Sequence, residues 1–232
     1  MKNCILLAFL FLSLTIYGQE KIYFTKDFKE VKSADLATYY STYEDIDGGT
    51  QRTTYNIDGT LKNSAQFSNM KRNIRNGTAK SWYKNGSIET VSFYVKNKLQ
   101  GLQTRYYENG QIKRTENFDK NEFVDGKCFD ENGSEITFFP YYEKPEFPGG
   151  NKEFYKYISQ SFKKPNDAIG TIKVKFVVQA DGKLREFEIL EGLNYDMNVE
   201  VLRVLHSSPA WTPGKVDGEI ADISYSIPIT IK

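Results

Sequence analysis

The stretch Ile223-Ser224-Tyr225-Ser226-Ile227-Pro228-Ile229-Thr230-Ile231 alternates apolar side chains with polar ones and a proline. Such alternation predicts a strand with one buried face, because successive side chains of a strand point to opposite sides of the sheet. Pro228 has no amide hydrogen, so it cannot complete a hydrogen-bond ladder on the side that its nitrogen faces. The stretch therefore predicts an edge strand, and an open edge can pair with another chain.

The residues before this strand predict a small α+β unit. Apolar side chains recur at helical spacing over residues 154–162 and again over residues 196–205. Between these helices, residues 172–178 alternate like a strand, Asp181-Gly182 predicts a tight turn, and residues 187–189 continue in a second strand. The order of helix, hairpin, helix and strand predicts two helices packed on one face of an antiparallel sheet.

The middle of the chain repeats. Asn85-Gly86, Asn109-Gly110 and Asn132-Gly133 are spaced by 24 and 23 residues, and Asp58-Gly59 is a looser earlier copy. Asn-Gly and Asp-Gly pairs between strand-prone runs predict hairpins, because a type I′ turn needs positive φ at both central positions. An aromatic residue precedes the Asn or Asp of each pair by three positions. This period predicts a stacked array of hairpins in which each unit buries the aromatic face of its neighbour.

The start of the chain predicts export. Lys2 precedes an apolar run from Ile5 to Leu14, which is about half of the roughly 20 residues that span a bilayer. The run predicts a signal peptide cleaved near Gly18, with an uncleaved anchor as the alternative. Removal of Lys2 with that segment leaves 30 basic and 30 acidic side chains. This balance argues against nucleic acid or an anionic membrane surface as the main partner.

No residue pattern predicts catalysis. His206 is the single histidine, and no cysteine lies near it in sequence. After cleavage Cys128 is alone and can form neither an internal disulfide nor a cysteine zinc site, so we expect it in the core. Trp211 is expected as a packing anchor under the last strand. We therefore predict a binding protein that is not an enzyme and that has no cofactor or metal.

The repeats resemble MORN-type repeats in the variant form found in bacterial proteins. The last copy departs from the pattern. Gly126 lies six residues before Asn132, whereas the glycine of each earlier copy lies eight residues before its asparagine. The resemblance implies a structural spacer or a surface for lipid or protein partners. Residues 76–136 hold nine basic and nine acidic side chains, which gives lipid binding no electrostatic support. The motifs that carry the resemblance are Asn76-Gly77, Trp82-Tyr83-Lys84-Asn85-Gly86, Lys98-Leu99-Gln100-Gly101 and Tyr106-Tyr107-Glu108-Asn109-Gly110.

Residues 143–232 resemble the C-terminal domain of TonB, in the form common in Bacteroidetes-type bacteria. The motifs are Pro145-Glu146-Phe147-Pro148-Gly149-Gly150, Gly170 with the strand to Asp181-Gly182, Trp211-Thr212-Pro213-Gly214-Lys215 and Ile227-Pro228-Ile229. The resemblance implies a domain that pairs with a short segment of an outer-membrane TonB-dependent transporter as an added strand. The partner-binding residues that it implies are Ile223, Ser224, Tyr225, Ser226, Ile227, Ile229 and Ile231.

The chain also departs from an energy-transducing TonB. That protein resembles a tethered rod, with an inner-membrane helix whose histidine faces motor partners and with a long proline-rich stalk. Here the leading apolar segment is short and has no histidine, and aromatic repeats stand in place of the stalk. Binding to a transporter therefore carries over, whereas coupling to inner-membrane motor proteins stays an open alternative, as does an inner-membrane anchor.

The predicted fold class is α+β, with an N-terminal β-hairpin array followed by a TonB-like domain. We expect a signal peptide at 1–18, degenerate capping hairpins at 19–75, MORN-variant repeats at 76–137, a linker rich in proline and glycine at 138–150 and the TonB-like domain at 151–232. The expected protein is periplasmic or otherwise in the cell envelope, and it binds neither nucleic acid nor a small-molecule substrate. The alternatives are an envelope scaffold that binds proteins through its repeats and an antitoxin-like or immunity-like binding protein.

Overall fold

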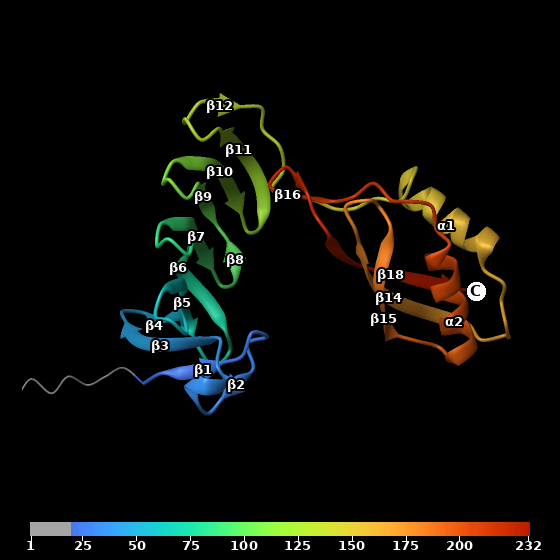
Figure 1. Cartoon of the computed structure of the whole chain (residues 1–232), viewed down its shortest axis with the longest axis horizontal. Helices are drawn as coiled ribbons and strands as arrows, with labels where there is room; N and C mark the ends of the chain where they lie inside the picture. Colours follow the sequence, from blue (N-terminus) through green and yellow to red (C-terminus); the bar gives the residue numbers. More distant parts are fainter. Residues whose placement is uncertain (1–19) are drawn as a thin grey trace, which may run out of the picture. The chain divides into compact units, whose positions relative to one another are not determined.

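The computed structural model describes residues 20–232, and the chain divides after Phe138 into two compact units (Figure 1). The structure is mostly antiparallel sheet with two α-helices, which confirms the α+β class. The expected signal peptide, residues 1–18, lies outside the described residues. Within residues 20–232 no helix is both long and apolar enough to cross a membrane.

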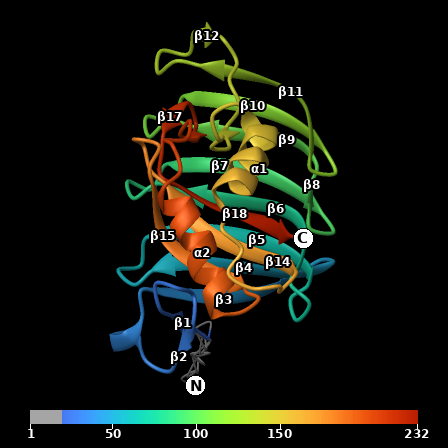
Figure 2. The same cartoon turned by 90° about the vertical axis from the view of Figure 1, so that its right-hand side faces the viewer.

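The first unit is one antiparallel sheet of 12 strands. From β3 onward each strand pairs with the strand that follows it in the chain, apart from the short β8, so successive strands lie side by side up to β12 (Figure 2). Strand β1 pairs with both β2 and β3 at the other end. The strands are β1 (Ile22–Phe24), β2 (Glu30–Val31), β3 (Tyr39–Ile46), β4 (Gly49–Asn56), β5 (Leu61–Asn69), β6 (Ile74–Trp82), β7 (Ile88–Val95), β8 (Lys98–Leu99), β9 (Gly101–Tyr106), β10 (Ile112–Asp119), β11 (Glu122–Phe129) and β12 (Glu135–Ile136).

The Asn-Gly and Asp-Gly pairs lie in hairpin turns, but these turns are not of type I′. Gly59, Gly86, Gly110 and Gly133 have φ angles between 84° and 90°, whereas the residue before each has a negative φ. Each glycine N–H donates to the carbonyl oxygen three residues earlier. This geometry is a type I turn followed by a left-handed glycine, a common three-residue hairpin connection. The prediction of type I′ turns at these pairs is therefore wrong.

Turns with positive φ at both central residues occur at the other ends of the strands. Lys96-Asn97 has φ angles of 48° and 69°, and Lys120-Asn121 has φ angles of 50° and 77°. The flanking residues pair directly, so these are two-residue hairpin loops. Asparagine tolerates this left-handed region better than most residues that have a side chain, which is why it stands at the second position of both loops.

Hydrogen bonds at both ends of the strands connect one repeat to the next. At one end a tyrosine hydroxyl donates to a backbone carbonyl oxygen of the following repeat, and at the other end an asparagine Oδ1 accepts from a backbone N–H of the preceding repeat. Each bond joins residues 22 or 23 positions apart, and the distances lie between 2.6 and 2.8 Å. The pairs, donor first, are Tyr83 and Tyr106, Tyr107 and Phe129, Arg75 and Asn97, and Leu99 and Asn121.

The second unit contains two α-helices and two three-stranded sheets. Its central sheet has the order β15-β14-β18, and the smaller sheet has the order β13-β16-β17. Asn194 caps the second helix, since its Oδ1 accepts from the Met197 N–H at 3.0 Å. The elements are β13 (Tyr142–Glu143), α1 (Gly150–Ser161), β14 (Gly170–Val178), β15 (Leu184–Glu191), α2 (Tyr195–His206), β16 (Lys215–Val216), β17 (Glu219–Ile220) and β18 (Ile223–Ile231).

Both helices share one hydrophobic core with the central sheet. The aromatic ring of Trp211 is nearly buried and lies between 5.4 and 6.0 Å, centroid to centroid, from the rings of Phe147, Phe154, Phe176 and Tyr225. Phe154 belongs to α1, Phe176 to β14 and Tyr225 to β18, so Trp211 packs between the first helix and the central sheet. It is the packing anchor that the sequence predicts. The apolar faces predicted for the helices are buried too, at Phe154 and Ile158 of α1 and at Met197, Val201, Val204 and Leu205 of α2.

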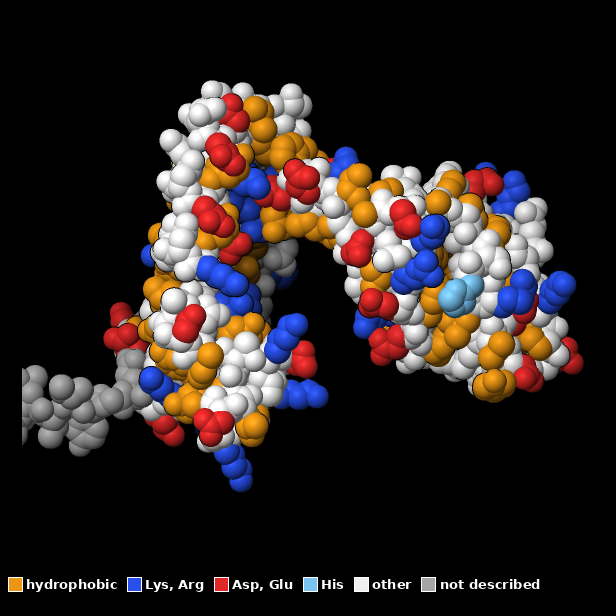
Figure 3. All heavy atoms as spheres, in the orientation of Figure 1, with side chains coloured by type: hydrophobic (Ala, Val, Ile, Leu, Met, Phe, Trp, Pro, Cys, Tyr) orange, Lys and Arg blue, Asp and Glu red, His pale blue; other side chains and the backbone are white. Residues whose placement is uncertain are grey.

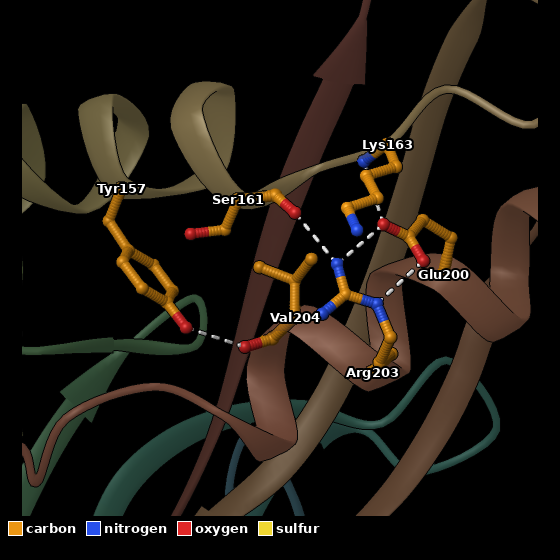
Figure 4. A network of polar contacts seen from close by, with 6 residues as sticks. All are labelled: Tyr157, Ser161, Lys163, Glu200, Arg203 and Val204. Atoms are coloured by element: carbon orange, nitrogen blue, oxygen red, sulfur yellow. Dashed lines mark hydrogen bonds and ion pairs between the residues drawn. The ribbon is translucent and has the colours of Figure 1, made fainter.

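A polar network fixes the end of α1 against α2 (Figure 4). Arg203 donates from Nε and Nη2 to both carboxylate oxygens of Glu200, at 2.7 and 2.6 Å, and Nη2 also donates to the Ser161 carbonyl oxygen at 2.7 Å. The Lys163 N–H donates to Glu200 at 2.7 Å, and Tyr157 Oη donates to the Val204 carbonyl oxygen at 3.0 Å. Hydrogen bonds from Arg203, and then from the Lys163 backbone, hold the pKa of Glu200 at about 2, below its ordinary 4.5.

Replacing Gly110 with valine should destabilise the first unit by about 1 kcal/mol or more, because a β-branched residue is strained at positive φ. A Cβ at this position would meet no atom within 4 Å, so the cost is conformational rather than steric. Gly110→Asn is the matched control and should stay near wild type, because asparagine tolerates this conformation. Thermal or denaturant unfolding of the three proteins measures the difference. Equal stability of the valine and asparagine variants would contradict this assignment of the turn.

Glu200→Gln should lower the stability of the second unit at neutral pH and flatten its acid dependence. Because the folded pKa of Glu200 is below the ordinary value, the stabilisation is complete above about pH 4.5 and is lost as the pH falls toward about 2. Asp58 and Asp181, whose pKa values are also lowered by hydrogen bonds to Thr60 and Lys183, are common to both proteins. The difference between the two melting curves over this pH range therefore isolates Glu200, and a constant difference would argue against the network.

Candidate strand-pairing edge

Strand β18 is paired along one side only. It runs antiparallel to β14 with nine residue pairs, from Ile223 opposite Val178 to Ile231 opposite Gly170, and without a register shift. Among the described residues no strand pairs with its other side, because β18 ends the order β15-β14-β18. The strand predicted from alternation and Pro228 is therefore present with the expected edge position. Its unpaired side is a candidate site for an added strand.

The side chains of β18 separate cleanly between core and solvent. Ile223, Ile227, Ile229 and Ile231 are buried, and Tyr225 is half-buried against the same core. The residues between them are exposed. The apolar side chains therefore anchor the strand and leave its backbone to make contacts along the edge.

The contact between Tyr155 and Pro228 shows which backbone groups face the open side. Tyr155 Oη, on α1, donates to the Pro228 carbonyl oxygen at 3.2 Å. The N–H and C=O groups of a strand residue point to the same side, and this side alternates along the strand. Residues in step with Pro228, namely Ser224, Ser226 and Thr230, therefore direct their backbone groups to the open edge. Pro228 has no N–H, so its nitrogen leaves no unsatisfied donor there.

A groove lies beside the second half of this edge. It has a volume of about 650 Å³ and lies between α1 and the end of β18. Its apolar lining includes Ile158, Phe162 and Ile229, while Lys164 and Tyr155 contribute polar groups. A side chain of an added strand could enter this space, since strand addition gains selectivity from pockets for alternate side chains.

The seven predicted partner-binding residues fall into two groups. The backbone groups of Ser224 and Ser226 face the open edge by the alternation described above. The other five bond to β14 and turn their side chains to the core, so they position the edge: Ile223, Tyr225, Ile227, Ile229 and Ile231. Thr230 and Tyr155 also lie at the open edge. The alternation along the strand could have placed Thr230 at the open edge, because it is two residues from Pro228. Nothing local in the sequence places Tyr155 there, because it is 73 residues from Pro228.

The other candidate residues take structural positions. His206 is exposed at the end of α2, visible in pale blue in Figure 3, and its ring lies 4.2 Å from that of Phe187. Cys128 is buried in the first unit, as expected of a core residue, and its Sγ accepts from Arg114 at 3.5 Å. Among residues 20–232 no group of three or more His, Cys, Asp or Glu side chains is arranged to hold a metal ion.

Comparison with protein families gives two matches, in the order expected. Residues 75–96 and 99–120 each match the family model described as a MORN repeat variant. Residues 164–231 match the model described as the Gram-negative bacterial TonB protein C-terminal. The second match contains α2 and every strand from β14 to β18, so it includes the open edge. No curated protein and no solved structure matches the chain.

Proposed function

We propose that the protein is a TonB-like binding protein that takes up a segment of an outer-membrane TonB-dependent transporter by strand addition to β18. The observation that carries the proposal is that β18 is hydrogen-bonded along one side and open along the other. The match of residues 164–231 to the TonB C-terminal family supports the choice of partner. On this proposal residues 151–232 are a TonB-like domain whose two helices cover its sheet.

The open edge offers a specific set of backbone partners. Ser224, Ser226 and Thr230 each present an N–H donor and a C=O acceptor, whereas Pro228 presents only its carbonyl, which Tyr155 occupies. An incoming strand therefore has full pairing opposite Ser224 and Ser226, and it must displace Tyr155 or pass it to reach Thr230. Main-chain hydrogen bonds would supply affinity. The groove beside Ile229 would select the side chain of the incoming strand that enters it.

This function requires export, so we propose that the protein acts in the periplasm or elsewhere in the cell envelope after cleavage of residues 1–18. It works by binding and catalyses no reaction. If it also transmits energy, inner-membrane motor proteins become additional partners, and the N-terminal segment would have to remain as an anchor.

A scaffold function for the repeats is the second candidate. The match to MORN repeat variants and the hydrogen bonds between successive repeats favour an extended, internally braced surface that can hold a protein. On this proposal the first unit is a hairpin array with residues 19–75 as its cap, and it presents or spaces the strand-binding domain. The scaffold and the strand-binding function are compatible in one chain.

The proposed function predicts opposite outcomes for proline at neighbouring positions. Ser226→Pro should leave the domain folded, because Ser226 faces the open edge as Pro228 does, and should weaken binding of a synthetic transporter segment by about tenfold or more through a lost donor and a clash. Tyr225→Pro should unfold the domain, because Tyr225 pairs with β14 opposite Phe176. Ser226→Ala keeps the amide and should bind like wild type.

Circular dichroism and peptide titration together decide the outcome. A folded Ser226→Pro protein that binds the segment with wild-type affinity would eliminate β18 as the receptor strand. A Tyr225→Pro protein that melts like wild type would show that the strand parity is assigned wrongly.

A further inference from the structure

We propose that one face of the first unit carries a binding site for an acidic peptide segment, built around Arg52 and Arg75. The site is independent of β18, because all of its residues belong to strands β4 to β9. It would give the repeats a ligand of their own, recognised by side chains rather than by backbone groups.

The register of three strands creates a hollow in this face. Ala65 of β5 lies opposite Ala79 of β6, which in turn lies opposite Ser92 of β7. Paired residues on neighbouring strands point to the same face and are roughly 4.8 Å apart. Three small side chains in a row therefore leave a depression, and its volume is about 270 Å³.

Arginine side chains frame this hollow. Arg52 of β4 pairs with Ala65 at one end of the row of small residues. Arg75 and Arg105 both line the hollow, together with Tyr94. Arg105 is held by its own strand neighbours, since it donates to Thr90 Oγ1 at 3.2 Å. Two arginines thus line a small polar depression, and Arg52 lies on the neighbouring strand, paired with Ala65 at its margin.

Arg52 and Arg75 stack on aromatic rings. The guanidinium carbon of Arg52 lies 5.1 Å from the centroid of the Phe67 ring, and that of Arg75 lies 5.5 Å from the centroid of the Tyr94 ring. A stacked guanidinium keeps its N–H groups in its own plane, free to point at a ligand, and the stack limits its rotation. The geometry therefore suits the two-point hydrogen bonding that arginine makes to a carboxylate.

Neither arginine has an acidic partner among the described residues. Neither guanidinium forms an ion pair within residues 20–232, and the Nε of Arg52, like the Nε atoms of Arg105 and Arg114, is buried without a hydrogen-bond acceptor. Burial lowers the pKa of Arg52, and the charge of Arg75 lowers it further, although Tyr43 acts in the opposite direction. Two like charges without a counterion disfavour each other, and a bound anion would relieve this repulsion.

Arg114 on the same sheet shows how the chain pairs an arginine for structure alone. It is almost completely buried, and its Nε lies 3.4 Å from Glu116 Oε2. Arg52 and Arg75 lack such a carboxylate and are only half-buried. On this proposal a ligand supplies the carboxylate that Arg52 and Arg75 lack.

The ligand class follows from the shape and charge of the hollow. A carboxylate on a flexible side chain can enter a recess between stacked guanidinium groups. A flat membrane surface cannot enter the recess and contacts the exposed charged side chains around it instead. Residues 76–136 hold nine basic and nine acidic side chains, which gives an anionic bilayer no excess of positive charge to bind. An extended acidic peptide, with carboxylates on alternate residues, fits these constraints.

The test titrates the exported full chain with a synthetic peptide of alternating glutamate and serine. The expected result is binding that weakens as salt is added, and that weakens at least tenfold in Arg75→Gln. Arg75→Lys keeps the charge but loses the two-point geometry, so it should bind with intermediate affinity. Arg72→Gln is the control, because Arg72 is an exposed arginine in the turn before β6 and does not line the hollow.

Each outcome decides the proposal. Binding that depends on Arg75 but not on Arg72, with unchanged melting temperatures, supports it. Lack of peptide binding, equal binding by Arg75→Gln, or an equal loss in Arg72→Gln overturns it. Binding of inorganic phosphate or of phosphatidylserine vesicles that depends on Arg75, without binding of the peptide, also overturns it in favour of a phosphate ligand. A glutamine-serine peptide that binds as well as the acidic one shows that charge is not recognised and overturns it too.

Discussion

The pairing of β14 with β18 is the interaction on which the second unit depends. Nine residue pairs bring two segments about fifty residues apart into one sheet and turn alternate side chains of both strands into the core. The same pairing satisfies one side of β18 and leaves the other open. The edge is therefore a direct consequence of how the unit folds, and Tyr155 of α1 contacts it at the Pro228 carbonyl oxygen.

The first unit is stabilised differently, because its described residues, 20–138, contain no α-helix. Each strand relies on its neighbours, and the Tyr83 and Tyr107 hydroxyls and the Asn97 and Asn121 side chains add a bond at each step. Stability in such an array is the sum of nearest-neighbour terms. Polar side chains can be buried on this sheet because they hydrogen-bond to one another. Ser41 bonds to Thr54, and Gln103 donates to Ser92.

Local patterns predicted much of this architecture, and long-range register explains what they missed. The alternation of residues 223–231 and the helical spacing of Val201 and Leu205 identified elements whose buried faces the structure confirms. The Asn-Gly pairs located the hairpins but not their turn type, because a type I turn followed by glycine has the same residues. The contact of Tyr155 with Pro228 and the row formed by Ala65, Ala79 and Ser92 depend on which strands and helices meet, which no local window contains.

The two proposed sites use opposite physical principles, and this separates them experimentally. Strand addition at β18 exchanges backbone hydrogen bonds with water for backbone hydrogen bonds with a peptide, so salt should affect it little. The arginine hollow would bind through charge, and screening should weaken it steeply. A backbone edge accepts many sequences and needs side-chain pockets for selectivity, whereas fixed guanidinium groups demand carboxylates at a set spacing. Together, the two proposed sites would give one chain separate positions for two chemically distinct segments.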